Sequence, residues 1–249
     1  MKDIIKKIYR KIIPTSIRKI IWKQKHKIFF KIDEGSFKKQ IRGSNNRIIS
    51  NGGHFQNINF DIIGENNTII IEEGVTLNDV TFMIRGNNNK AVIEKNVWYH
   101  MGGNINQWGH NTYLKIGSDT TIEQANFGVY EDNSKIVIGS NCMLSRGIYI
   151  RTGDNHLIFD VTTNKRINFA KDIIIGNHVW ISEDCNILKG VNISEDSIIG
   201  YGSIVTKKFT ETNVIIAGNP AKIVKKNVNF SSEECPPNNI KLGNFEYRK

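Results

Sequence analysis

The side chains best suited to chemistry in this 249-residue chain are its six histidines and three cysteines. One of them, His156, ends the run Arg151-Thr152-Gly153-Asp154-Asn155-His156 and opens a polar loop that continues through Lys171. A neutral imidazole has a pKa near physiological pH, so it can take a proton from a hydroxyl or bind a metal ion. The elements that hold the histidine decide which role is available.

A six-residue repeat between residues 173 and 225 is the strongest structural signal. Aliphatic residues recur at every sixth position, and mostly small residues follow four positions later. The two series are Ile175, Ile181, Ile187, Ile193, Ile199 and Val205, and Val179, Cys185, Val191, Ser197 and Ser203. A period of six fits neither a helix nor simple alternation, so it requires short strands separated by tight turns. The pattern predicts an all-β solenoid.

From about residue 41 the repeat continues with a longer period. Its aligned strand residues lie 22 or 23 positions apart: Ile71, Ile93, Ile116 and Ile138. Asparagine turns precede the strands, and we expect them to be structural corners because asparagine tolerates the required backbone conformations: Asn45-Asn46, Asn66-Asn67, Asn88-Asn89, Asn111 and Asn133. Two triples should point inward from three faces: Ile71, Leu77 and Met83, then Ile138, Leu144 and Ile150.

The six-residue rhythm stops after Ile150 and resumes at Ile175. A loop of this length inside a repeat is usually functional, so residues 151–172 are predicted to leave the solenoid. A solenoid grows by adding coils, and one elongated domain over residues 41–226 therefore suffices. Residues 1–40 are predicted to form a short basic amphipathic helical segment, and residues 227–249 a C-terminal tail.

Several short runs resemble the signature of hexapeptide-repeat acyltransferases. They are Val179-Trp180-Ile181, Lys189-Gly190-Val191, the run from Ile199 to Lys207, and Ala217-Gly218-Asn219-Pro220-Ala221-Lys222. The chain is similar in particular to galactoside, maltose and polysaccharide O-acetyltransferases, with specific motifs over roughly residues 110 to 226. The resemblance implies a left-handed parallel β-helix, acetyl-CoA as donor, and a homotrimer with a CoA cleft between neighbouring subunits.

The resemblance also implies roles for individual residues. His156 would be the general base, Asn126 in Ala125-Asn126-Phe127 would hold the acceptor or the base, and Trp180 would lie in the substrate cleft. A backbone N–H near Ser182 would stabilise the oxyanion. Two residues depart from the family pattern. Tyr201 stands where the family usually has a small residue, and Ser182 replaces the usual glycine after Trp180-Ile181. The implied CoA contacts are Trp180, Ser182, Gly200, Tyr201, Gly202, Thr206, Lys207, Gly218, Pro220 and Lys222.

Two other chemistries fit the repeat less well. A cysteine nucleophile is disfavoured because Cys142 and Cys185 occupy small-residue turn positions, which predicts buried free thiols. A three-histidine metal site is disfavoured because His156 falls after the third face of its coil and His178 after the first face of the next. We therefore expect no metal. The odd cysteine set, without a C-x-x-C motif, favours a reducing cytoplasm.

The positive charge is concentrated at the N-terminus. Residues 1–40 hold thirteen Lys or Arg against three acidic residues, which equals the net charge of +10 for the whole chain, so residues 41–249 are neutral overall. This segment carries isoleucines at helical spacing and is predicted to contact an anionic membrane at the inner face of the cell, or to cover the open end of the solenoid. No apolar run is long enough to cross a bilayer. The neutral repeat region gives no reason to expect nucleic acid binding.

Together these features predict an acetyl-CoA-dependent O-acetyltransferase. Its acceptor would be a sugar hydroxyl of a surface polysaccharide or of a precursor. Two alternatives remain open from the sequence: an N-acetyltransferase that acts on an amino-sugar nucleotide, and a non-catalytic solenoid scaffold.

Overall fold

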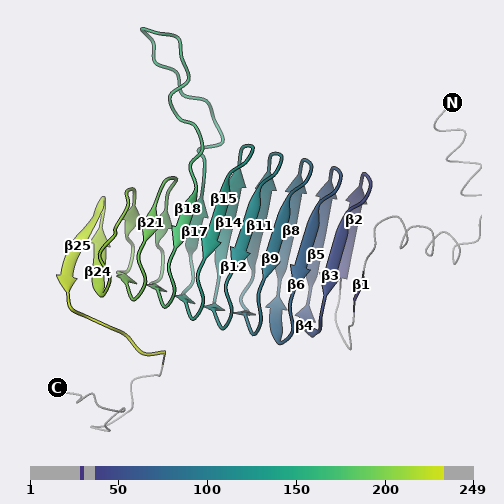
Figure 1. Ribbon diagram of the computed structural model, residues 1–249, viewed down its shortest axis with the longest axis horizontal. Coiled ribbons are helices and arrows are strands. Elements are labelled where there is room, and N and C mark those ends of the chain that lie inside the picture. The colour runs from purple at the N-terminus through teal and green to yellow at the C-terminus, as the bar shows by residue number, and fades with distance from the viewer. Residues whose placement is uncertain (1–28, 31–36, 233–249) are drawn as a thin grey trace, which may run out of the picture.

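The computed structural model describes residues 29–30 and 37–232, and this part of the chain is built from strands and turns (Figure 1). Successive strands wind into coils with three faces, and each face is a sheet that stacks one strand from each coil. The predicted parallel β-solenoid is confirmed. Its left-handed winding stays a prediction.

The three faces are named in the order in which each coil contributes to them. The first face contains β1 (Phe29–Phe30), β3 (Arg47–Ser50), β6 (Thr68–Ile71), β9 (Lys90–Ile93), β12 (Tyr113–Ile116), β15 (Lys135–Ile138), β18 (Ile173–Ile175) and β21 (Asn192–Ile193). The second face contains β4 (Gly53–Gln56), β7 (Val75–Asn78), β10 (Trp98–Tyr99), β13 (Thr121–Ile122), β16 (Met143–Leu144), β19 (Trp180–Ile181), β22 (Ile198–Ile199), β24 (Val214–Gly218) and β25 (Ala221–Lys226). The third face contains β2 (Phe37–Arg42), β5 (Ile58–Ile63), β8 (Val80–Arg85), β11 (Gly103–Trp108), β14 (Ala125–Tyr130), β17 (Ile148–Arg151), β20 (Asn186–Ile187) and β23 (Ile204–Val205).

Inward-pointing aliphatic side chains form one continuous core along the solenoid axis. The six residues of the first predicted series, from Ile175 to Val205, are all buried, and each such side chain contributes roughly 1.5–3 kcal/mol when it leaves water. The prediction for Met83 is wrong, because this side chain is only half-buried while its neighbour Phe82 is fully buried. Only Asp79 separates β7 from β8, so the inward residue Phe82 follows Leu77 after five positions instead of the six that the repeat predicts.

Asparagines shape the corner between the third and first faces, as predicted. Asn66 and its equivalents in other coils adopt left-handed backbone conformations, with φ of 59° at Asn66. The following asparagines Asn46, Asn67 and Asn89 are buried and form a column, in which each Oδ1 accepts a hydrogen bond from the backbone N–H of the next coil. Asn67 Nδ2 also donates to Gly86 O at 2.9 Å. The column therefore satisfies backbone groups that the turn leaves unpaired.

Residues 152–172 leave the solenoid between β17 and β18 and project as an arm (Figure 1). The arm folds back on itself through an antiparallel bridge between Phe159 and Arg166. The expectation of a polar loop is incomplete, because the arm also exposes large apolar side chains: Leu157, Ile158, Phe159, Val161, Ile167 and Phe169. A soluble surface rarely leaves so many apolar groups together without a partner.

The two ends of the solenoid differ. Strand β2 begins at Phe37, before the predicted domain boundary at residue 41, and Phe29–Phe30 within the predicted helical segment form the short strand β1. Residues 1–28 and 31–36, with the predicted membrane contact, lie outside the described residues. At the C-terminal end, β25 turns back and pairs antiparallel with β24, and Phe209 adds a parallel bridge to Ile193. No helix within the described ranges is long and apolar enough to span a membrane.

Replacing Asn67 by alanine should lower the free energy of unfolding by about 2–4 kcal/mol, because the Gly86 carbonyl and the Asn89 backbone N–H both lose their partner. Urea denaturation measures the change. The matched control is Asn66→Gly, which keeps the left-handed corner conformation at an exposed neighbouring position. Equal losses in both variants would show that the column adds nothing beyond corner geometry.

Candidate active site

His156 lies near the point where the arm leaves the solenoid, and its side chain is exposed. The arm is anchored by Thr152, whose backbone N–H donates to Gly128 O at 2.9 Å and whose carbonyl accepts from Lys171 N at 2.9 Å. Buried Asn168 then fixes the backbone beside the histidine, because its Nδ2 donates to His156 O at 2.7 Å. The histidine is thus exposed on a tethered backbone, which suits a group that must meet an incoming substrate.

An ion pair strengthens the base of the arm. Lys189 Nζ contacts the Asp154 carboxylate and also donates to Asn168 O at 3.1 Å, while Asn168 Nδ2 donates to Asp154 at 2.9 Å. Partial burial works to raise the pKa of Asp154, but the hydrogen bonds from Lys189 and Asn168 outweigh it and hold the pKa below its usual value. The carboxylate is therefore ionised at neutral pH, and its contribution to stability is lost only when pH falls through this lowered pKa.

Asn126 lies on β14 and faces outward from the third face. Its Oδ1 accepts hydrogen bonds from Asn104, at 3.2 Å from the backbone N and 3.0 Å from Nδ2. It lines a hollow of about 250 Å³ together with Tyr149 and Arg151. Asn126 pairs in register with Tyr149 on β17, the strand from which the arm departs. The fold therefore places Asn126 on the same face as the base of the arm that carries His156.

Trp180 lies on a different face. It projects from β19 on the second face, and the ring of Phe230 packs against it at 5.9 Å between centroids. Phe230 also stacks on His178 at 4.1 Å. Within one chain the three predicted catalytic residues are therefore divided between two faces. The covering of Trp180 by Phe230 was missed from the sequence, since it joins residues far apart without any repeat relation.

The backbone N–H of Ser182 already has a partner in the fold, and an oxyanion donor near Ser182 stays a prediction. The Ser182 N–H donates to Ile199 O at 3.0 Å, as part of the regular hydrogen bonding between coils. This donor is therefore committed to the fold and is not free to stabilise developing charge.

The implied CoA contacts form two groups. One group lies on or beside the second face, in the corner after β22 and in the β24–β25 hairpin: Trp180, Ser182, Gly200, Tyr201, Gly202, Gly218, Pro220 and Lys222. Tyr201 is exposed and its hydroxyl donates to Asp184 at 3.1 Å, which raises the pKa of Tyr201. The other group, Thr206 and Lys207, follows β23 at the corner between the third and first faces.

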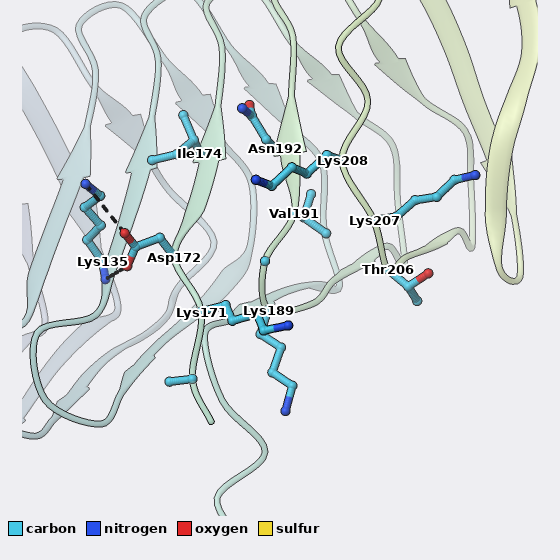
Figure 2. A pocket seen from close by; sticks show the side chains of 12 residues that line it. Lys135, Lys171, Asp172, Ile174, Lys189, Val191, Asn192, Thr206, Lys207 and Lys208 are labelled. Atoms are coloured by element: carbon cyan, nitrogen blue, oxygen red, sulfur yellow. Dashed lines mark hydrogen bonds and ion pairs between the residues drawn. The ribbon is translucent and has the colours of Figure 1, made fainter. Parts of the chain in front are cut away.

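Thr206 and Lys207 border a basic pocket of about 840 Å³ (Figure 2). Its cations are Lys135, Lys171, Lys189, Lys207 and Lys208. Asp172 pairs with Lys135 at 3.5 Å, and in Figure 2 Lys207 points away from the other lysines. Of these five lysines the sequence analysis named only Lys189 and Lys207. The others were missed because they reach this pocket only through the stacking of coils. The excess of ammonium groups suits an anionic ligand such as a phosphate.

The cysteines and histidines follow the predicted register. Cys142 and Cys185 are buried free thiols, and burial raises the pKa of Cys142 to about 11. Such thiols are poor nucleophiles at neutral pH. His178 lies in the corner after β18, one face along the coil from the arm, and contacts Asp196 at 2.8 Å. Within residues 37–232 no three His, Cys, Asp or Glu side chains are grouped so as to hold a metal ion.

Comparison with known proteins gives a consistent result. The solved structure of a polySia-specific acetyltransferase, NeuO, is 35% identical, has a TM-score of 0.73, and matches 81% of this chain and 85% of its own length. The structure of the polysialic acid O-acetyltransferase OatWY is 30% identical, has a TM-score of 0.60, and matches 85% of this chain and 89% of its own. No family model matches the chain.

Curated relatives match over a shorter stretch. The polysialic acid O-acetyltransferase of Escherichia coli O1:K1 / APEC is 44% identical over 113 residues, 45% of this chain and 36% of that protein. The Neisseria meningitidis enzyme of the same description is 36% identical over 115 residues, 46% of this chain and 53% of that protein. The matched stretch thus spans about half or less of these two curated relatives.

The chain is a three-faced parallel β-solenoid interrupted by one arm that bears a histidine. This fold and site place it in the class of hexapeptide-repeat proteins. With the identities above, the chain belongs to the hexapeptide-repeat acetyltransferase family that includes the polysialic acid O-acetyltransferases.

Replacing Asn168 by alanine should loosen the arm without unfolding the solenoid, because its amide joins Asp154, His156 and Ile158 at one point. We expect hydrogen exchange in residues 155–170 to speed up by a factor that corresponds to about 1–3 kcal/mol of local stability. Mass spectrometry of exchange measures this. The control Asn164→Gly keeps the left-handed backbone at the arm's turn, and faster exchange in both variants alike would contradict the anchoring role of Asn168.

Proposed function

We propose that this protein transfers an acetyl group from acetyl-CoA to a hydroxyl of a surface polysaccharide or of its precursor. The observation that carries the proposal is the match to the polySia-specific acetyltransferase, at 35% identity over 81% of the chain. The left-handed winding of the coils is part of this proposal, since the resemblance to hexapeptide-repeat acyltransferases implies it.

In the proposed reaction the imidazole of His156 takes the proton of the acceptor hydroxyl as the oxygen attacks the thioester carbonyl of acetyl-CoA. The tetrahedral intermediate then collapses, the C–S bond breaks, and the imidazolium returns the proton to the CoA thiolate. Direct transfer is favoured over an acyl-enzyme because Cys142 and Cys185 are buried and burial raises the pKa of both. Asn126, on the same face, would hold the acceptor.

The donor's phosphates would lie in the basic pocket beside Thr206 and Lys207. Ammonium groups compensate phosphate charge as point charges without demanding one geometry. The second-face group around Gly200 and Gly218 would then contact the remainder of the donor.

A homotrimer would complete this site. His156 and Asn126 lie on the third-face side of a chain and Trp180 on its second face, so a cleft between neighbouring chains would bring the two sets together. The apolar arm supports this arrangement, since Val161 at its tip is 98% exposed in the single chain. A neighbour's surface would cover these side chains.

The His156→Ala variant should lose turnover by roughly 10²–10⁴-fold, the usual contribution of a general base, while acetyl-CoA binding and folding persist. Acetyl transfer to purified host polysaccharide, followed by mass spectrometry and NMR of the product, measures the loss and separates O- from N-acetylation. The control is His54→Ala, at an exposed histidine on β4. Near-normal turnover in His156→Ala would remove this residue from the mechanism.

The Val161→Asp variant tests assembly, because a charge buried against a neighbour is costly whereas one in water is not. We expect light scattering to show a trimer for the native chain and smaller species for the variant, with loss of transfer activity. Asn164→Asp, at an exposed turn position of the same arm, should remain trimeric. An active native monomer would contradict a site shared between chains.

A further inference from the structure

Three aromatic side chains lie on the third face near the arm, two of them exposed and one half-buried. Trp108 ends β11 and Tyr130 ends β14, and the two residues pair in register with rings 5.4 Å apart. Trp108 is 41% exposed, and Tyr149 on the next strand is 52% exposed. Rings that remain in water beside one another offer flat apolar area for a ligand.

These rings line two adjoining hollows. The first holds about 250 Å³ and is bordered by Asn126, Tyr149 and Arg151. The second holds about 260 Å³ and is bordered by Trp108, Asn155 and Leu157. Tyr130 lines both hollows. Because Asn155 and Leu157 flank His156 in the chain, the second hollow is bordered by both sequence neighbours of the residue proposed as the base.

The polar groups between the rings are mainly neutral amides. Asn104, Asn106 and Asn126 all border the first hollow. A pyranose ring has an apolar face of C–H groups and a rim of hydroxyls, so aromatic planes interleaved with amides match both of its surfaces.

The charges favour one kind of sugar chain. Arg151 is exposed and borders the first hollow. In the part of the chain that the structure describes, its side chain has no hydrogen-bond or ion-pair partner, and the Asp154 carboxylate attracts it only through a longer-range electrostatic interaction. Its guanidinium group can donate two parallel N–H hydrogen bonds to a carboxylate. At the second hollow, Arg166 is already paired with Glu131, and Asp132 stands beside them, which disfavours a densely charged phosphodiester backbone.

We propose that the Trp108–Tyr130 pair and Arg151 form an extended subsite for an acidic polysaccharide. The ring pair stacks on a sugar unit away from the reacting hydroxyl, and Arg151 binds a carboxylate of the chain. This inference rests on the proposed function, and it adds an acceptor-chain contact that neither His156 nor Asn126 supplies.

The test compares Trp108→Ala with Trp98→Ala, which removes a similarly exposed tryptophan, at 47%, from the second face. The probes are α2,8-linked polysialic acid, the corresponding sialic acid dimer, and neutral dextran. We expect Trp108→Ala to raise the KM for the long acidic polymer about tenfold, the worth of a good stacking contact. Its kcat, its KM for the dimer and its KM for acetyl-CoA should stay unchanged, as should every parameter of Trp98→Ala.

A second variant tests the charge independently. Arg151→Gln should weaken polysialic acid binding about tenfold in titration calorimetry without donor, and should make that binding less sensitive to salt. The control Arg146→Gln removes a cation that is paired with Glu183 at 2.8 Å outside the hollows and should leave binding intact.

The possible results separate this inference from the proposed function. Polymer binding without acetyl transfer, weakened by Trp108→Ala and Arg151→Gln, keeps the subsite and overturns the proposed function. Acetyl transfer with polymer KM values equal in Trp108→Ala and Trp98→Ala overturns the subsite alone. Light scattering that shows dissociation of Trp108→Ala would assign the rings to a contact between copies, and dextran binding equal to that of polysialic acid would overturn the role of Arg151.

Discussion

Hydrogen bonds between successive coils are the constraint on which the rest of this structure depends. A strand in a single coil has no partner for its own N–H and C=O groups, so each coil is stable only when it is stacked on another. The buried column of Asn46, Asn67 and Asn89 carries the same bonding around a corner where no strand exists. At the base of the arm the Thr152 Oγ1 accepts a hydrogen bond from Tyr130 N at 2.8 Å, so bonding between coils continues where the arm leaves the solenoid.

This constraint decides where chemistry can lie. Inward positions are needed for the core and backbone groups are needed for stacking, as the committed N–H of Ser182 shows. Functional groups are therefore confined to outward side chains, corners and the arm. Because outward residues of one chain face three directions, His156 and Trp180 diverge, and the proposed site is complete only where two chains meet.

The sequence predicted what the repeat encodes and little that lies between repeats. Ile71, Ile93 and their aligned successors are buried in register because each obeys the same local rule. Met83 failed because one corner is a residue shorter, and no pattern marks that change. The lysine pocket, the Asp154–Lys189 pair and the contact of Phe230 with Trp180 join residues from different coils. Such contacts depend on stacking geometry, which periodicity alone does not supply.

The reversal of the chain at β25 has a consequence for behaviour at high concentration. A parallel solenoid ends in open strand edges, and such an edge is a template on which another molecule could continue the stack into a filament. Antiparallel pairing fills the second-face edge with β25, whose exposed residues include Lys222, Lys225 and Lys226. Phe209 occupies part of the first-face edge by bonding to Asn192 and Ser194. At this end of the described solenoid, fewer backbone groups are therefore left open for a second molecule to stack on.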